Sequence, residues 1–328
     1  MRRNRKRGRI VFLVIGLILG IYLGKVFNKG IKVPFVEPRL VWSIGIYAGK
    51  SPVNLMSHPG VKNPVLTARD VTDVPAWGLA DPFMVFENGE WYLFMEVLDR
   101  QSKRGEIGLA TSKDGKTWRY RQIVLTEPFH LSYPYVFKFD GSYYLVPEAG
   151  KSCGVRLYRA TEFPRKWTLA GVLVPEALVD PCLFQYGGKW WLFACRVPDK
   201  RDLTKRFLEV FWADNLLGPW VRHPKSPVAT GASIARPGGR VISFGGKLLR
   251  YAQDDYPTYG RQVRALEITR LTPEDYAERE IPLEPPLKAS GKGWNAKGMH
   301  TVDPHPLADG TWLAVVDGQE RILEFGWK

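Results

Sequence analysis

A β-hairpin that begins with proline recurs five times along this chain. Each copy has a proline, a short apolar run, a turn dipeptide containing glycine, and a second strand rich in aromatic or aliphatic residues. The five prolines and their turns are Pro82 with Asn88-Gly89, Pro134 with Asp140-Gly141, Pro181 with Gly187-Gly188, Pro237 with Gly245-Gly246, and Pro304 with Asp309-Gly310. Asn, Asp and Gly take the positive φ that a two-residue hairpin turn requires at least cost, so each dipeptide predicts a tight hairpin.

The spacing of these prolines predicts a five-bladed β-propeller. Successive prolines lie 52, 47, 56 and 67 residues apart, a period typical of four-stranded propeller blades. A third apolar strand follows each of the first four hairpins, and a tryptophan opens the fourth strand in three of them. The third strands are Ile107–Thr111, Val155–Arg159, Leu208–Trp212 and Val263–Ile268, and the tryptophans are Trp118, Trp167 and Trp220.

The fifth blade has too few residues after Asp317 for two further strands. We therefore expect the N-terminal segment, around either Trp42–Tyr47 or Pro64–Thr67, to complete it and close the ring without exposed edges. Paired aromatic residues follow three of the turns, at Trp91-Tyr92, Tyr143-Tyr144 and Trp190-Trp191. Their fixed offset from the turn favours packing between blades over a platform for stacking sugars.

Charge along the 328 residues is concentrated at the N-terminus. The whole chain has a net charge of +14, but residues 1–32 hold nine Lys or Arg and no acid, which leaves 38 basic and 33 acidic side chains in residues 33–328. A domain with a net charge of +5 and no basic stripe does not favour nucleic-acid binding. The length suits one propeller over residues 40–328, preceded by a short segment.

That N-terminal segment predicts a membrane anchor. Residues 1–9 form a basic tail, residues 10–27 are apolar apart from Tyr22 and Lys25, and residues 28–39 read as a linker. A span needs about 20 apolar residues, so residues 10–27 predict a short transmembrane signal anchor. The basic tail should remain cytoplasmic, which makes this a single-pass protein with an extracytoplasmic propeller. A cleaved signal peptide is the alternative, although no small-residue cleavage site follows.

Cysteine and metal motifs are sparse. The chain has three cysteines, an odd number, and their spacing is not that of metal ligands. We expect all three, Cys153, Cys182 and Cys195, to be buried free thiols. No EF-hand, H-E-x-x-H or paired-cysteine motif is present, so no cofactor is predicted, and a Ca²⁺ in the channel is left open as an alternative. Ser112–Trp118 resembles an Asp-box turn and is interpreted as a hairpin device.

Equivalent positions of the five copies should converge on the propeller axis, because the first strand of each blade lines the channel. The residues before the prolines are Asp81, Tyr133, Asp180, Arg236 and Asp303. The two-residue turns set the pairing along each hairpin, which places Glu96 opposite Asp81, Glu148 opposite Tyr133, and Cys195 opposite Asp180. Opposed residues have Cβ atoms about 5 Å apart, so Asp81 and Glu96 would be close carboxylates, and their repulsion would raise the pKa of one of them.

The ends of the second strands add Arg196, Asp254 and Asp317 to the same mouth, and His300 lies just upstream of Asp303. Acids gathered with Arg and His in an open cavity suit a ligand rich in hydroxyl groups, and paired carboxylates are the equipment of glycoside hydrolysis. The alternative is an internal network of ion pairs that holds the inner strands together.

The motifs on these strands carry a family resemblance. They are Ala80–Phe83, Phe129–Pro134, Val146–Glu148, Val179–Pro181, Ala235–Gly238 and Tyr251–Asp254. With them the segment from Trp42 to about Asp317 resembles the N-terminal domain of plant glucosamine inositolphosphorylceramide transferases and related bacterial proteins. That domain is similar to the five-bladed propellers of glycoside hydrolase family 43. In the plant proteins a glycosyltransferase domain follows this domain. We do not expect that domain in the present chain, which ends at Lys328.

The likeness to family 43 implies a base on the first blade, a second carboxylate that tunes pKa values, and an acid. Asp81 matches the base and Asp180 the tuning residue, while the usual place of the acid holds Arg236, so Glu148 is the candidate acid. Our first hypothesis is a membrane-anchored, carbohydrate-active propeller that processes a glycan or glycoconjugate. The second is a non-catalytic glycan- or glycolipid-binding module that assists a separate glycosyltransferase, and it predicts that Arg236 forms salt bridges with both acids. A protein-interaction propeller is a third.

Overall fold

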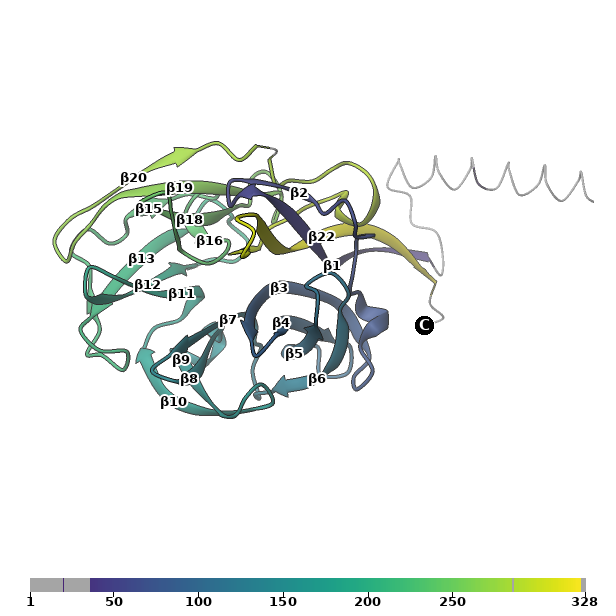
Figure 1. Ribbon diagram of the computed structural model, residues 1–328, viewed down its shortest axis with the longest axis horizontal. Helices are drawn as coiled ribbons and strands as arrows, with labels where there is room; N and C mark the ends of the chain where they lie inside the picture. The colour runs from purple at the N-terminus through teal and green to yellow at the C-terminus, as the bar shows by residue number, and fades with distance from the viewer. Residues whose placement is uncertain (1–19, 21–35, 285, 326–328) are drawn as a thin grey trace, which may run out of the picture. The chain divides into compact units, whose positions relative to one another are not determined.

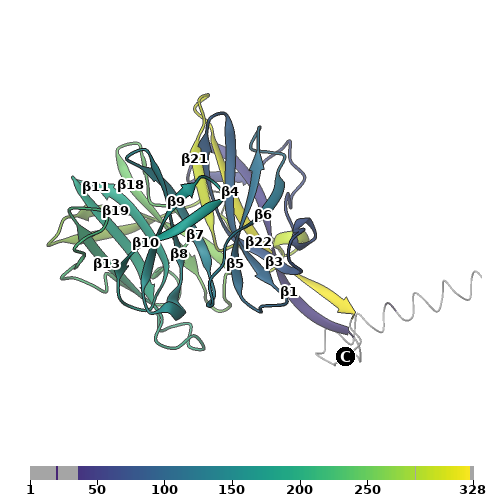
Figure 2. The same ribbon diagram turned by 90° about the horizontal axis from the view of Figure 1, so that it is seen from below.

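The computed structural model describes Gly20, residues 36–284 and residues 286–325. The described strands form five sheets arranged around a central axis, as Figure 1 shows, and Figure 2 shows them from a perpendicular direction. The predicted five-bladed propeller is therefore confirmed. Apart from Gly20, the predicted basic tail and transmembrane anchor lie outside the described residues. Within the part of the chain that is described, no helix combines the length and apolarity needed to cross a membrane.

Blades 1 and 2 are regular antiparallel sheets of four strands in chain order from the axis outward. Blade 1 contains β3 (Ala76–Glu87), β4 (Glu90–Asp99), β5 (Gly105–Ser112) and β6 (Arg119–Leu125). Blade 2 contains β7 (Ser132–Phe139), β8 (Ser142–Glu148), β9 (Val155–Glu162) and β10 (Lys166–Val174). Three short 3₁₀ helices lie between strands of the described chain, at η1 (Ala68–Asp70), η2 (Gly150–Ser152) and η3 (Gly293–Asn295).

Blades 3 and 4 contain shorter and interrupted strands. Blade 3 has β11 (Leu178–Tyr186), β12 (Lys189–Arg196), β13 (Phe207–Ala213) and β14 (Val221–Arg222), and β15 (Ala229–Thr230) also pairs with β13. Blade 4 has β18 (Lys247–Asp254), β19 (Gln262–Leu271) and β20 (Tyr276–Ile281), and its inner strand is divided into β16 (Arg236–Pro237) and β17 (Ile242–Phe244). Gly238, whose added Cβ would lie 2.9 Å from backbone C of Ala252, follows β16 where the strand is broken.

The fifth blade combines strands from both ends of the described chain. Its order is β2 (Asn54–Ser57), β1 (Val36–Ser51), β22 (Trp312–Phe325) and β21 (Val302–Pro306). The expectation that Trp42–Tyr47 supplies a strand is confirmed, since it lies within β1, whereas the other candidate segment makes a single bridge between Leu66 and Ile44. Most of the five blades lies in one compact unit, Val41–Glu320. The first residues of β1, 36–40, and the last residues of β22, 321–325, belong to a second, small unit.

The turn chemistry predicted from the sequence holds in four of the five hairpins. At 88–89, 140–141, 187–188 and 245–246 both residues have positive φ, between 46° and 76°. The fifth hairpin differs from the prediction, because its last paired residues are Pro306 and Trp312 and a five-residue loop joins them. Asp309 accepts a hydrogen bond from the backbone N–H of Thr311, and only Gly310 has positive φ.

Aromatic contacts join every pair of neighbouring blades. The ring pairs, with centroid distances of 4.8 to 5.9 Å, are Phe94–Trp167, Phe139–Trp190, Phe193–Tyr276, Phe244–Trp312 and Trp91–His305. Trp91, Tyr143 and Trp190, the first members of the paired aromatics, are buried. These contacts favour the interpretation that the pairs pack between blades.

The cysteine prediction is partly wrong. Cys182 and Cys195 are buried free thiols within strands, as expected, but Cys153 is exposed. Cys153 lies in the connection between β8 and β9, where it ends η2 with φ of 55°. It is exposed because it is not part of a strand that faces a neighbouring blade.

Candidate functional site

The residue before the proline takes an unusual backbone conformation in blades 1, 2 and 3. Asp81, Tyr133 and Asp180 have φ of 51°, 47° and 51°. The left-handed region costs a residue with a Cβ about 1–2 kcal/mol. The register of each inner hairpin shifts at this point, which identifies a β-bulge. Bulges redirect side chains and are common beside functional sites.

These bulges correct the predicted pairing by one residue. Glu96 pairs with Ala80, Glu148 with Ser132, and Cys195 with Val179. The prediction assumed one residue on each strand per step, and each bulge adds an unpaired residue before the proline. The carboxylate of Asp81 is therefore not directly opposite that of Glu96, although the two are near enough that the charge of Glu96 helps to raise the pKa of Asp81.

Asp81 is buried near the middle of β3, with 4 % of its surface exposed. Its Oδ1 accepts a hydrogen bond from the Thr301 hydroxyl at 2.8 Å and lies 3.6 Å from Nε2 of His300. Its Oδ2 accepts the backbone N–H of Tyr133 at 3.3 Å. Burial raises the pKa of Asp81 to about 7, against the opposing charge of His300.

His300 is fixed between Asp317 and Trp42. Its Nδ1 lies 2.6 Å from Oδ2 of Asp317, and its ring stacks on the Trp42 indole with centroids 4.0 Å apart. Burial lowers the pKa of His300, but the charges of Asp317 and Asp81 outweigh that effect and raise it to about 9. The imidazole is therefore a cation at neutral pH.

Asp81, His300 and Asp317 are also the group of described residues with ligand atoms close enough for a cation, all within 4.8 Å of one another. A metal ion there would have to displace a ring proton of His300, whose Nδ1 faces Asp317 and whose Nε2 faces Asp81. The arrangement thus fits an internal charge cluster. In this cluster the imidazolium of His300 supplies the positive charge between the two carboxylates.

Arg236 joins the two other predicted catalytic acids. Its Nε donates to Oδ2 of the fully buried Asp180, and its Nη2 lies 3.7 Å from Oε2 of Glu148. Gln253 also donates to Oδ2 of Asp180, at 2.7 Å, while Oδ1 has no hydrogen-bond partner among the described residues. Burial raises the pKa of Asp180 to about 7, and the Arg236 guanidinium opposes this.

Glu96 has a histidine partner that the sequence did not single out. Nε2 of His130 lies 3.2 Å from Oε1 of Glu96, and Nδ1 of His130 accepts the backbone N–H of Gly105 at 2.8 Å. Because Nδ1 accepts, Nε2 carries the proton and donates to Glu96. Burial lowers the pKa of His130, but hydrogen bonding and the charge of Glu96 raise it overall.

A cavity of about 380 Å³ opens over these groups. Its walls contain five of the predicted site residues: Asp81, Glu96, Glu148, Arg236 and His300. They also contain residues that sequence reasoning missed, and the principal ones are Trp42, His130, Lys200, Arg206 and Tyr259. His130 lies in the Phe129–Pro134 motif and Trp42 begins the predicted strand Trp42–Tyr47, but neither pattern placed its residue at the site. The Tyr259 ring lies 5.1 Å from the Arg236 guanidinium, so it helps to hold Arg236 in place.

Five predicted residues do not line this cavity. Asp180 lies behind Arg236, and the ring of Tyr133 packs 4.7 Å from Phe83 while its hydroxyl donates to Gly239 O. Asp303 accepts hydrogen bonds from Arg240 at 2.7 Å and from Met84 N at 2.8 Å.

Arg196 and Asp254, which we expected at the same mouth, are held by their own blades. Arg196 pairs with Glu209 at 2.8 Å and stacks on Phe207, because its strand end directs it along blade 3. Asp254 accepts hydrogen bonds from Gln262 at 2.6 Å and from Arg264 at 2.8 Å within blade 4. Asp317, by contrast, joins the His300 cluster.

The axis is crossed by hydrogen bonds below the cavity. Arg240 donates to Asp303 of blade 5, to Val136 O of blade 2 and to Met84 O of blade 1. The predicted network of ion pairs therefore exists at this level, where it ties inner strands together. At the level of the cavity Arg236 and His300 also form ion pairs, and these pairs border the open space.

Comparison with known proteins gives the chain relatives at both the sequence and the fold level. A family model described as glucosamine inositolphosphorylceramide transferase 1, N-terminal, matches residues 37–319. Glucosamine inositolphosphorylceramide transferase 1 of Oryza sativa subsp. japonica is 40% identical over 297 residues, which cover 84% of this chain and 40% of the rice protein. The chain thus spans about two fifths of the length of the curated relative it matches.

Solved structures show the fold at low sequence identity. β-1,2-Mannobiose phosphorylase from Listeria innocua is 13% identical with a TM-score of 0.60, covering 83% of this chain and 96% of that chain. A variant of the GH43 protein BlXynB from Bacillus licheniformis is 15% identical with a TM-score of 0.53, covering 76% of this chain and 53% of that chain. The resemblance expected from the motifs is confirmed, and the chain belongs to the family of glucosamine inositolphosphorylceramide transferase 1 N-terminal domains.

Proposed function

We propose that the axial cavity is a saccharide-binding site and that the propeller is a non-catalytic glycan- or glycolipid-binding module. The observation that carries this proposal is the contact of Arg236 with both Asp180 and Glu148. A general acid must hold a proton that it can give to a leaving oxygen. Glu148 is already paired with the Arg236 guanidinium, so its carboxylate is placed to accept hydrogen bonds rather than to serve a leaving oxygen.

The cavity has the composition that sugar recognition needs. Carboxylates of Glu96 and Glu148 accept hydrogen bonds from hydroxyl groups, and the Arg236 guanidinium supplies donors. The aromatic rings of Trp42 and Tyr259 add apolar surface on the same wall. A volume of about 380 Å³ is near the lower end for small-ligand pockets, enough for roughly one or two sugar rings.

Hydrolysis is the second candidate, and the pKa of Asp81 is the observation that favours it. A carboxyl group with a pKa of about 7 can exchange a proton near neutral pH. In this candidate Asp81 activates water, Glu148 protonates the leaving oxygen, and Asp180 tunes their pKa values. It requires Glu148 to leave its ion pair with Arg236 before it can act on a leaving oxygen, which is why we place it second.

The cellular setting follows from the N-terminal sequence. The apolar residues 10–27 support a single-pass anchor that holds the propeller outside the cytoplasm, close to glycolipid headgroups. The rice relative is named as a glucosamine inositolphosphorylceramide transferase, which supports a glycolipid as the ligand and a separate glycosyltransferase as a partner.

Binding and turnover are tested together on one panel of oligosaccharides and glycosylated inositolphosphorylceramides. Wild-type protein and the Asp81→Asn variant are titrated by calorimetry, and each mixture is then analysed for released sugar. The proposal expects binding to both proteins with no product from either. Product from the wild type that disappears in Asp81→Asn would establish the hydrolase instead, and absence of binding to the whole panel would remove both candidates.

A further inference from the structure

We propose that the propeller has a second saccharide-binding site, at the opposite end of its inner strands from Asp81. A cavity of about 680 Å³ lies there between blades 5, 1 and 2. β3 reaches it with Val85, Phe86 and Glu87, five residues beyond the axial cavity, so the two sites are roughly 17 Å apart along the strand. This site is independent of the proposed function of the axial cavity, since no residue lines both.

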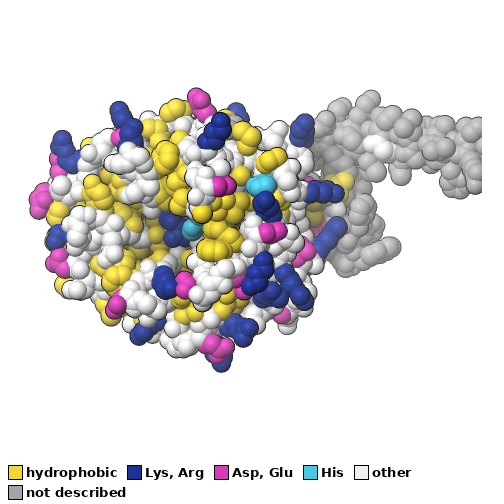
Figure 3. Space-filling model, viewed as in Figure 1, with side chains coloured by type: hydrophobic (Ala, Val, Ile, Leu, Met, Phe, Trp, Pro, Cys, Tyr) yellow, Lys and Arg dark blue, Asp and Glu magenta, His cyan; other side chains and the backbone are white. Residues whose placement is uncertain are grey.

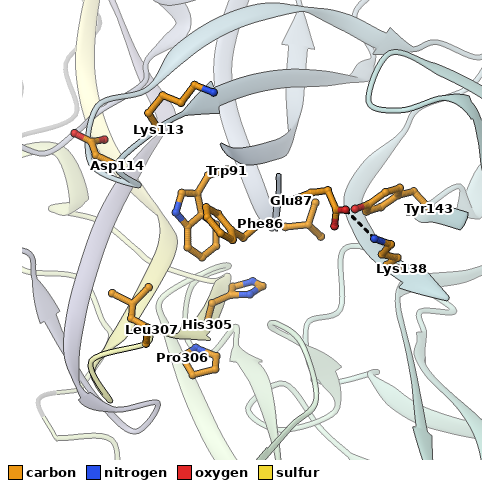
Figure 4. Close-up of a pocket in the computed structure, with 12 residues that line it drawn as sticks. Phe86, Glu87, Trp91, Lys113, Asp114, Lys138, Tyr143, His305, Pro306 and Leu307 are labelled. Atoms are coloured by element: carbon orange, nitrogen blue, oxygen red, sulfur yellow. Dashed lines mark hydrogen bonds and ion pairs between the residues drawn. The ribbon is translucent and has the colours of Figure 1, made fainter. Parts of the chain in front are cut away.

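Aromatic and aliphatic side chains form the central part of the wall of this second cavity, as Figure 4 shows. Phe86 leaves 53% of its surface exposed, and its ring centroid lies 4.9 Å from that of Trp91. His305 meets the Trp91 ring edge to face at 5.6 Å, and Pro306 and Leu307 continue the apolar surface. Phe86 is the exposed ring of this pair and is backed by the buried Trp91, so its face is a surface on which a sugar ring can stack through its C–H groups.

Charged groups stand on two sides of these rings, and most have partners. Lys138 pairs with Glu87 at 2.8 Å, and Lys113 pairs with Glu90 at 3.5 Å. Asp114 accepts hydrogen bonds from Lys116 N and Thr117 N in its own turn, and Nε2 of His305 contacts Asp303. The cavity therefore offers many donors and acceptors but no strong uncompensated charge, which fits a neutral ligand with hydroxyl groups.

A purely apolar ligand fits less well. A lipid chain in this cavity would remove water from the Glu87–Lys138 pair and supply no hydrogen bonds in return, which is costly. Sugar hydroxyls can bond to the same groups while the C–H face covers Phe86. The volume also lies within the range of about 300–1,000 Å³ common for small ligands.

Tryptophan indole signals separate the two sites. In ¹⁵N-labelled protein, the Nε1–H resonance of Trp91 reports the second cavity and that of Trp42 the axial cavity, and each is assigned from a Trp→Phe variant. The protein is titrated with cellobiose, lactose, β-1,2-mannobiose and β-1,3-galactobiose, each up to about 50 mM, to cover the millimolar range of weak binding. We expect the Trp91 signal to shift in a saturable way with at least one disaccharide.

Phe86→Ala should weaken the affinity reported by Trp91 at least ten-fold and leave the Trp42 response unchanged. Tyr186→Ala is the matched control, because Tyr186 is a 46% exposed aromatic residue beside the blade 3 turn and does not line the cavity. A Trp91 signal that stays fixed with every disaccharide overturns the second site, as does an unchanged Trp91 response in a folded Phe86→Ala protein. A fixed Trp42 signal would instead count against the axial site.

Discussion

The Arg236 guanidinium contacts two carboxylates from different blades, Asp180 of blade 3 through Nε and Glu148 of blade 2 at 3.7 Å through Nη2. Arg236 itself belongs to blade 4, so this side chain links three blades around the axial cavity. Removing one member of a buried ion pair leaves the other charge uncompensated. The stability of the folded protein should therefore depend strongly on Arg236.

Replacing Arg236 with Met should destabilise the protein by about 3–5 kcal/mol, because Asp180 is fully buried and would lose its cationic partner. Adding Asp180→Asn to the same chain should recover part of that loss. Urea unfolding measures both. The control is Arg201→Met, whose side chain is 93% exposed and should change stability by less than about 0.5 kcal/mol. A loss in Arg236→Met as small as in the control would contradict the buried pair.

The bulge at Asp81 predicts a strict order among substitutions there. Asn tolerates the left-handed conformation, whereas a β-branched residue does not, so Asp81→Asn should retain more stability than Asp81→Val. We expect a difference of about 1–3 kcal/mol, measured by thermal or urea unfolding. The same pair of substitutions at Asp303, which has no positive φ, controls for loss of the carboxylate. Equal effects at the two positions would argue against backbone strain at Asp81.

His300 should make stability depend on pH in the alkaline range. Its pKa is about 9 in the folded protein against 6.5 for an ordinary histidine, so its stabilising effect is complete below pH 6.5 and is lost as pH rises through 9. On the order of 2–3 kcal/mol should disappear between these values. Urea unfolding at pH 6.5 and 9.5 should show this fall in the wild type and a smaller one in His300→Gln. Identical profiles for the two proteins would show that His300 is not a buried cation.

Closure of the ring by β1 predicts a high cost for cavities in that strand. Ile46 is fully buried, so Ile46→Ala should cost about 2–5 kcal/mol. Met56 on the neighbouring strand β2 is 51% exposed, and Met56→Ala should have little effect. Unfolding curves for the two variants provide the comparison. If Ile46→Ala is as mild as Met56→Ala, β1 is not an integral part of the blade.

Glu148 should contribute to saccharide affinity through a charge-assisted hydrogen bond, typically worth about 1.5–3 kcal/mol. Glu148→Gln is therefore expected to weaken binding at least ten-fold, as measured by calorimetric titration. Glu162→Gln is the control, because Glu162 is an exposed residue at the end of β9. An affinity that is the same in both variants would place the sugar elsewhere.

Local chemistry explains why much of the fold was predictable from the sequence. A Gly-containing dipeptide fixes a hairpin turn through two φ angles, and five repeats at blade-like spacing specify a propeller before any contact is known. The strand that closes the ring was predictable because an apolar run near the N-terminus was the remaining partner for blade 5. The loop at 307–311 was not, since Asp309 bonds to Thr311 instead of taking positive φ.

The site was predictable only to the extent that it follows from the repeat. Equivalent positions brought Asp81, Asp180 and Arg236 to the axis, but pairing arithmetic cannot show a bulge, because an extra residue leaves no mark in the turn. Arg196 and Asp254 were misplaced because oppositely charged neighbours on the next strand hold them. Tyr259 and Lys200 come from loops outside the repeat, which only the folded chain brings to the cavity.

The charges on the folded surface agree with the small net charge of +5 that the sequence gives for residues 33–328. Figure 3 shows basic and acidic side chains intermixed around the rim of one face, with hydrophobic side chains toward its middle. This distribution does not form a continuous basic stripe on the face shown.

The most direct test is a crystal structure of the wild-type protein soaked with a disaccharide that binds in the calorimetric panel. The account predicts an intact disaccharide in the axial cavity, with hydroxyl groups bonded to Glu148 and Arg236 and its glycosidic bond uncleaved. A cleaved product in that cavity, or a sugar bound elsewhere while the cavity stays empty, would contradict it.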